Sequence, residues 1–273
     1  MTREVHVFDN DVRVFDDQLV AGQKDRYLIR NVHESDEEDI FIELIRAIPA
    51  GGCFVNIGAA IGYYPLLARK IAPHLIIHAV EPLGRFRGYF RENMTLNGVG
   101  PTDFTIHTEA ISYREGDQRF VDNGYSSVLF EVRRRMENAS ATAAVKSTVK
   151  VLLNRAGLRK LDSQESTTVI TIQTITLDHL LTSVGTVVDL LQMDVQGAEA
   201  EILQGALNSL RSGSIRTFLI GTHSQALHQA CSAVLRRHGY EIEYQEPHPR
   251  GQPDGIIVAS RGARKLNVPS GRA

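Results

Sequence analysis

The stretch from Cys53 to Tyr64, which reads CFVNIGAAIGYY, constrains the fold of this chain more than any other segment. Its first half, Cys53–Ile57, is a short apolar run with a β-branched bias, which is typical of a buried strand. Gly58 and Gly62 then surround two alanines, and glycine suits a turn that needs a positive φ or that a ligand approaches closely. In residues 63–70 the apolar side chains recur with helical spacing. The stretch therefore predicts a strand, a glycine turn and a helix whose N-terminus directs free N–H groups at the turn.

The spacing of these glycines differs from that of a dinucleotide-binding turn. A nicotinamide cofactor is bound by G-x-G-x-x-G, whereas this chain has Gly58-x-x-x-Gly62 with Ala59 and Ala60 between them. A pyrophosphate needs the missing glycine, but a ligand without phosphate at this point, such as the amino-acid end of S-adenosylmethionine, does not. Taken alone, the glycine turn is equally compatible with an ordinary connection that binds nothing.

A second apolar run, Leu75–Val80, ends in Glu81-Pro82. In a doubly wound sheet this position lies at the C-terminal end of the second strand, beside the first turn. An acidic residue there can accept hydrogen bonds from both ribose hydroxyls of a nucleoside. Glu81 together with the glycine turn indicates a site for a ribose-containing cofactor.

Strands and helices alternate through most of the chain, which predicts an α/β fold with a doubly wound, mostly parallel sheet and a C-terminal antiparallel hairpin. One helix is expected over Ala198–Leu210. The further expected strands are Phe104–His107, Val169–Ile172, Val187–Met193, Ile215–Ile220, Glu241–Tyr244 and Ile256–Ala259.

The expected domain organisation has one cofactor-binding domain with additions. Residues 1–50 form a hairpin and a helix that cover the site, with Ser35 and Glu38 as a capping box at the helix start. Residues 51–260 form the cofactor-binding domain, with a cap insertion at about 116–165. Residues 261–273 are expected to be a disordered tail.

Composition limits the partners that we expect. The net charge of −2 gives no electrostatic reason to expect nucleic acid or a membrane surface. Cys53 and Cys231 are expected to be packed thiols, which fits a reducing compartment, and the N-terminus has no apolar signal-peptide segment. We therefore expect a cytoplasmic protein that acts on a small molecule; the sequence does not indicate an oligomeric state.

Four polar residues fall at predicted strand ends: Asn56, Glu81, Asp194 and His223. Ligands of such sheets bind beyond the carboxyl ends of the strands, so these side chains are candidate site residues. Two alternatives remain open: Asp194 could cap the helix that follows it, and His223 could bond a neighbouring backbone group.

Four segments resemble the FkbM family of S-adenosylmethionine-dependent methyltransferases: VNIGAAIGYYPLLAR, HAVEP, Asn93–Asn97 and LLQMDVQGAEAEILQGA (Leu190–Ala206). The resemblance runs from about Asn56 to Ser260, with a gap in the middle. It implies a class I methyltransferase fold and S-adenosylmethionine as cofactor. The family usually has Asp at position 56 and Glu at position 196, where this chain has Asn56 and Gln196. The cofactor-binding residues implied are Asn56, Gly58, Ala60, Gly62, Tyr63, Glu81, Pro82, Glu109, Ala110 and Asp194, with Glu109 placed near the adenine amino group.

Methyl transfer requires an acceptor aligned with the methyl group and a group that removes its proton. His223 is the predicted catalytic base, because its ordinary pKa is near 6.5. Asp194 is predicted to orient the acceptor hydroxyl or the histidine. Asp194 and His223 could instead hold a divalent cation, but without a clear third ligand we assign no metal.

Three functions compete. The first is an O-methyltransferase acting on a hydroxyl of a sugar or a secondary metabolite. A nicotinamide-dependent oxidoreductase is disfavoured by the missing glycine and by the lack of a Tyr-x-x-x-Lys pair. A non-catalytic nucleoside-binding module gains support from Asn56. Nucleic-acid methylation is disfavoured by the charge and by the lack of an Asn/Asp-Pro-Pro-aromatic motif.

Overall fold

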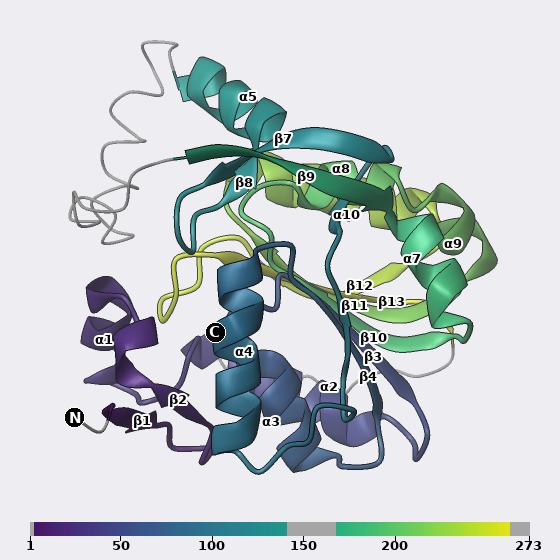
Figure 1. The fold of residues 1–273 in the computed structure, drawn as a ribbon. Coiled ribbons are helices and arrows are strands. Elements are labelled where there is room, and N and C mark those ends of the chain that lie inside the picture. Colours follow the sequence, from purple (N-terminus) through teal and green to yellow (C-terminus); the bar gives the residue numbers. More distant parts are fainter. Residues whose placement is uncertain (1–2, 141–167, 263–273) are drawn as a thin grey trace.

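A central sheet organises the computed structural model, which describes residues 3–140 and 168–262 (Figure 1). Within these residues the sheet has seven strands in the order β12-β13-β11-β10-β3-β4-β5. Neighbouring strands from β11 to β5 are parallel, and β13 is antiparallel to both β11 and β12. This confirms the predicted mostly parallel sheet and its C-terminal antiparallel pair. The strands are β3 (Cys53–Ile57), β4 (Ile76–Val80), β5 (Thr105–His107), β10 (Val188–Met193), β11 (Ile215–Thr222), β12 (Glu241–Glu246) and β13 (Gly255–Ser260).

Helices cover both faces of this sheet, and Figure 1 shows α2, α3 and α4 below it and α7 to α10 above it. Every residue of β3, β10 and β13 is buried, which explains why these strands read as continuous apolar runs rather than as alternating ones. The helices are α2 (Ser35–Ala47), α3 (Tyr63–Ile71), α4 (Gly84–Leu96), α7 (Leu177–Val184), α8 (Glu199–Gln204), α9 (Leu207–Ser212) and α10 (Gln225–Arg237).

The single helix predicted over Ala198–Leu210 is wrong, because the chain breaks it into α8 and α9. A Cβ on Gly205 would lie 2.5 Å from the carbonyl oxygen of Ser112, so the backbones pass very close at this point. The carboxylate of Asp178 accepts the N–H groups of Asn208 (3.0 Å) and Ser209 (2.8 Å) at the start of α9. These contacts stabilise a second helix start where the sequence indicated none.

A second sheet of four strands lies over α8 and α10 in the described part of the chain, with the order β6-β9-β7-β8 (Figure 1). It uses the described part of the predicted insertion, residues 116–140; residues 141–165 of that insertion lie outside the described residues. The predicted strand Val169–Ile172 is the central part of β9 and belongs to this sheet. Its elements are β6 (Ala110–Ser112), β7 (Gly116–Asp122), β8 (Val128–Leu129), α5 (Phe130–Ser140) and β9 (Thr168–Thr176).

Helix α5 lies against the turn that follows β10. Met136 Sδ is 3.1 Å from the point where a Cβ on Gly197 would lie, and Arg135 forms an ion pair with Glu201 of α8. The described part of the insertion therefore covers the backbone that leads from Asp194 into α8.

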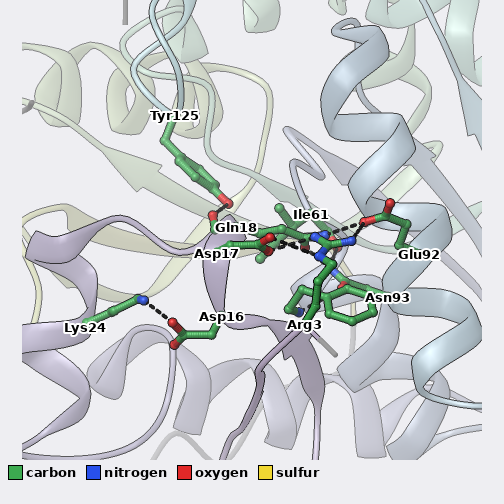
Figure 2. Close-up of polar contacts among 10 residues, drawn as sticks. Arg3, Asp16, Asp17, Gln18, Lys24, Ile61, Glu92, Asn93 and Tyr125 are labelled. Carbon is green, nitrogen blue, oxygen red and sulfur yellow. Dashed lines mark hydrogen bonds and ion pairs between the residues drawn. The ribbon is translucent and has the colours of Figure 1, made fainter. Parts of the chain in front are cut away.

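The N-terminal residues form the predicted hairpin, followed by short helices. Figure 2 shows how Gln18 fixes them: its Nε2 donates to Glu92 (2.9 Å) and its Oε1 accepts from Asn93 Nδ2 (2.8 Å). Asn93 also donates to the carbonyl of Ile61 in the glycine turn (3.0 Å), and the hydroxyl of Tyr125 donates to the carbonyl of Gln18 (2.8 Å). The N-terminal portion is thus bound to the glycine turn. Its elements are β1 (Val5–Val7), β2 (Arg13–Phe15), η1 (Asp16–Gln18) and α1 (Ala21–Tyr27).

Helix α2 begins at Ser35, but the predicted capping box is wrong. The N-cap residue is Glu34, which makes no side-chain cap bond, and the N–H of Glu37 in the first turn donates to Gln252 Oε1 (2.9 Å) while Glu38 bonds elsewhere. Its Oε2 accepts the hydroxyl of Tyr63 (2.5 Å) and its Oε1 accepts Asn10 Nδ2 (2.8 Å). Tertiary contacts therefore use the carboxylate that would have closed the box, and they join α2 to the start of α3.

Two expectations about the whole chain can be compared with the structure. Cys53 and Cys231 are both buried free thiols, as predicted. Among the described helices, none has the length and apolar character that crossing a membrane requires. The predicted tail from Arg261 onward lies, from residue 263, outside the described residues.

Candidate active site

The glycine turn between β3 and α3 has an unusual backbone. Gly58, Ala60 and Gly62 all have positive φ, at +91°, +46° and +86°. A Cβ on Gly58 would overlap the carbonyl oxygen of Asp194, and a Cβ on Gly62 would overlap the ring of Phe90. The positive φ expected of these glycines is confirmed, and close packing against Asp194 and Phe90 is a second reason for both, independent of any ligand.

Glu81 joins this turn to the end of β4. It is 5% exposed; its Oε2 accepts the N–H of Ala60 (2.9 Å) and its Oε1 accepts the N–H of Leu83 (2.7 Å). Burial raises the pKa of Glu81 to about 7, and the two backbone N–H groups partly oppose that rise. Each carboxylate oxygen keeps a further lone pair, so the group can also accept hydrogen bonds from two hydroxyls of a bound ribose.

Asn56, at the end of β3, belongs to a buried polar chain that reaches α2. Its Nδ2 donates to Gln192 Oε1, and Gln192 Nε2 donates to Glu37 Oε1 (3.0 Å). Asn56 Oδ1 and Glu37 Oε2 are buried without a hydrogen-bond partner in the described structure. Burial, followed by the charge of Asp194, raises the pKa of Glu37 to about 8. Unsatisfied acceptors of this kind fit the amino-acid end of S-adenosylmethionine, whose ammonium group donates hydrogen bonds.

Sequence reasoning missed Glu37, although a signal was available. It shares the apolar face of α2 with Phe41 and Leu44, four and seven residues further on. A carboxylate on a core-facing stripe is uncommon and indicates a buried polar partner.

Asp194 and His223 come together as the sequence predicts. They directly follow β10 and β11, which are parallel neighbours, and His223 Nε2 lies 3.3 Å from Asp194 Oδ1. Two further carboxylates contact the imidazole: Asp254 Oδ1 is 3.4 Å from Nε2 and Glu199 Oε1 is 3.2 Å from Nδ1. The imidazole of His223 therefore lies among three carboxylates at the sheet edge beside Gly58.

Neither alternative for these two residues is found. Helix α8 has Ala198 at its N-cap, so Asp194 does not cap it. The ring nitrogens of His223 have no hydrogen-bond partner in the described structure, backbone groups included. The turn after β10 is instead held by Glu199, whose Oε1 accepts the N–H groups of Val195 (3.1 Å) and Gly197 (3.2 Å).

The charges of the cluster change its protonation. Burial alone would lower the pKa of His223, but Asp254, Glu199 and Asp194 together raise it well above 6.5. Burial raises the pKa of Asp194 to about 7, against the opposing effect of His223. An imidazolium has no free lone pair, so His223 can accept a proton only in its neutral form.

Asp254 and Glu199 were not predicted as site residues. Asp254 lies in the Pro/Gly-rich loop before β13, where no strand-end pattern marks it. Glu199 is the last residue of the DVQGAE motif, which was recognised as a family motif, but no role was predicted for this glutamate.

The remaining predicted cofactor residues are spread around this edge. The side chain of Tyr63 is buried toward the N-terminal portion, and the carbonyl of Pro82 accepts Arg87 Nη1 (2.6 Å). Glu109 is half-buried directly before β6, where its Oε2 accepts the N–H of Thr108, and Ala110 is buried. Their contacts with a cofactor stay predictions.

Two features define a class I methyltransferase fold. The first is the strand order of the central sheet, in which β13 is the antiparallel strand. The second is the glycine turn after β3, which is bonded to the acidic residue Glu81 after β4. The family model described as the Methyltransferase FkbM domain matches residues 56–253. The chain belongs to this family of S-adenosylmethionine-dependent methyltransferases, as its motifs predicted.

Individual relatives cover the chain to different extents. The AMB antimetabolite synthetase AmbE of Pseudomonas aeruginosa is 24% identical over 84% of this chain and 12% of its own length. A protein named as a methyltransferase in Jannaschia sp. is 34% identical over 30% of this chain and 32% of its own length. The chain thus spans a third or less of the relatives it matches. The FkbM methyltransferase of Methylobacillus flagellatus KT has a TM-score of 0.47 at 12% identity, covering 78% of this chain and 44% of that one.

Proposed function

We propose that this methyltransferase transfers the methyl group to a hydroxyl of a small molecule, such as a sugar or a secondary metabolite. The observation that supports this most is the placement of His223 and Asp194 at the sheet edge beside Gly58, with Nε2 and Oδ1 3.3 Å apart. A hydroxyl acceptor needs help in losing its proton, and an imidazole beside a carboxylate is suited to that task.

The cofactor is proposed to bind across the glycine turn. Glu81 is suited to the ribose, because backbone N–H groups fix both of its oxygens. Asn56 Oδ1 and Glu37 Oε2 are suited to the ammonium group, which would satisfy two buried acceptors. When bound there, S-adenosylmethionine supplies an electrophilic methyl group on a sulfonium.

The chain's contribution to catalysis is proposed to be mainly alignment. Asp194, held beside the turn, would orient the acceptor oxygen, and His223 would remove the hydroxyl proton. The fixed position of Glu199 behind the imidazole limits its rotation, because Glu199 is itself bonded to two backbone N–H groups. The buried side chain of Glu199 would therefore orient the imidazole of His223.

A small acceptor is favoured over a macromolecule by two observations. The net charge of −2 gives no electrostatic reason to expect nucleic acid as the acceptor. AmbE, by its name a synthetase of an antimetabolite, is similar over 84% of this chain. We propose a metabolite acceptor on these grounds, and a cytoplasmic location because the free buried thiols of Cys53 and Cys231 suit a reducing compartment.

The acceptor atom can be tested directly. The protein is incubated with S-adenosylmethionine carrying a ¹³C-methyl group and a panel of sugars, hydroxylated acids and phenols, each paired with its amino analogue. We expect the label in an O-methyl group, identified by its carbon chemical shift, for at least one hydroxyl compound. Label found in N-methyl products of the amino analogues alone would contradict the proposal.

A further inference from the structure

The residues around His223 have the arrangement of a metal site, because three separate segments each contribute one ligand atom. Asp194 follows β10, His223 follows β11 and Asp254 precedes β13, so all three are fixed by neighbouring strands. Their ligand atoms lie within 4.8 Å of one another. The side chains of these residues are 13% to 21% exposed, so the cluster lies close to the surface of the described structure.

Glu199 provides a second and independent indication. Its side chain is completely buried, its Oε1 faces His223 Nδ1 at 3.2 Å, and its Oε2 has no hydrogen-bond partner in the described structure. A histidine that binds a metal through one nitrogen usually has its other nitrogen fixed by a carboxylate or carbonyl. Here Nδ1 lies in ion-pair contact with Glu199, without hydrogen-bond geometry, and Nε2 is the nitrogen nearest to Asp194 and Asp254.

Hydrogen bonds within the protein do not satisfy this cluster. Asp194 Oδ1 and His223 Nε2 are inaccessible to water, yet neither has a partner of acceptable hydrogen-bond geometry in the described structure. Buried polar atoms are rarely left in this state, so such a pair indicates a missing ligand. An ion between them would be bound by both atoms.

The local charge also favours a cation. Besides Asp194, Asp254 and Glu199, two carboxyl groups of the α2 region, Glu34 and Glu37, are buried nearby. Glu34 pairs with Arg26 (3.9 Å), whereas Asp194, Asp254 and Glu199 all face the single imidazole of His223. Uncompensated buried charge is costly, so a cation among these three carboxylates would be stabilised.

We propose that Asp194, His223 and Asp254 bind a divalent metal ion, with His223 Nε2 and one oxygen from each carboxylate as ligands. A donor set of one imidazole and two carboxylates suits Mn²⁺, and Zn²⁺ and Mg²⁺ are the other ions to test. Three protein ligands leave coordination positions open. If the chain acts on a hydroxyl as proposed above, the ion would bind that oxygen and lower its pKa, which removes the need for His223 to be the base.

The test measures metal binding alone, without cofactor or acceptor. The chelator-treated and dialysed protein is titrated with Mn²⁺, and free Mn²⁺ is counted by electron paramagnetic resonance. We expect one bound ion per chain and displacement by Zn²⁺, which binds such donors more tightly. Asp254→Asn should weaken binding by about tenfold or more, and Glu199→Gln by about tenfold through its effect on His223.

Asp117→Asn is the matched control, because Asp117 is an exposed carboxylate on β7. It should bind Mn²⁺ like the unaltered chain. Thermal unfolding of the metal-free variants shows whether each is folded, and Asp194→Asn replaces Asp254→Asn if that variant is not. Lack of saturable binding of Mn²⁺, Zn²⁺ and Mg²⁺, or equal binding by the variants and the control, would refute the site. A chain that binds Mn²⁺ but transfers no methyl group would refute the proposed function and leave the metal site standing.

Discussion

Replacing His223 by alanine is expected to lower methyl-transfer turnover by about 100-fold or more, with affinity for S-adenosylmethionine nearly unchanged. His223 Nε2 lies 3.3 Å from Asp194 and 3.4 Å from Asp254, whereas the ribose candidate Glu81 is bonded to the N–H groups of Ala60 and Leu83. Loss of the imidazole should therefore affect the group that receives the acceptor proton and not the group that holds the ribose. Single-turnover rates and calorimetric affinities, measured on the same preparation, separate the two effects.

His179→Ala is the control for this experiment. His179 is an exposed histidine on α7 that pairs with Glu115 at the surface, so its removal should leave turnover unchanged. Full turnover in His223→Ala would show that neither a base nor a metal ligand at this position is needed. A loss of cofactor affinity equal to the loss of turnover would show that His223 belongs to the cofactor site instead.

Gly58→Ala is expected to destabilise the protein by about 3 kcal/mol or more. Alanine at a φ of +91° costs roughly 1–2 kcal/mol, and the added Cβ overlaps the backbone oxygen of Asp194, which costs about 1–3 kcal/mol to relieve. A backbone atom of a buried strand end cannot rotate away as a flexible side chain could. Denaturant unfolding measures the loss against a total stability of about 5–15 kcal/mol.

Gly88→Ala provides the matched comparison, because Gly88 lies inside α4 and a Cβ added there meets nothing within 4 Å. Alanine has the higher helix propensity, so this variant should gain about 0.5–1 kcal/mol. Similar stabilities for the two variants would show that the turn can rearrange away from Asp194. The account of why Gly58 is a glycine would then be wrong.

The main fold was predictable because its signals are local. Continuous apolar runs such as Cys53–Ile57 indicate strands buried on both faces, and polar residues directly after them mark the ligand edge. That rule placed Asp194 and His223 on adjacent strand ends, and the pairing of β10 with β11 brings them into contact. Consecutive parallel units tend to lie side by side, which made the order of neighbouring strands in the sheet predictable as well.

What could not be predicted depends on long-range contacts. Asp254 reaches His223 only because β13 inserts beside β11, which brings a loop without any strand-end pattern to the site. Glu37 meets Gln192 across a sequence separation of 155 residues. The second sheet pairs β7 with β9 in the same way, and short strands that pair at long range carry no local signal of their partner.

The most direct test of this account is a calorimetric titration of the chain with S-adenosylmethionine and, separately, with NAD. We predict saturable binding of S-adenosylmethionine at one site per chain and no comparable binding of NAD, because the glycine turn lacks the residue that a pyrophosphate needs. Glu81→Ala should weaken binding of S-adenosylmethionine by roughly 1–3 kcal/mol, the scale of a lost hydrogen bond to a charged group. Tighter binding of NAD, or an affinity for S-adenosylmethionine that Glu81→Ala does not change, would contradict it.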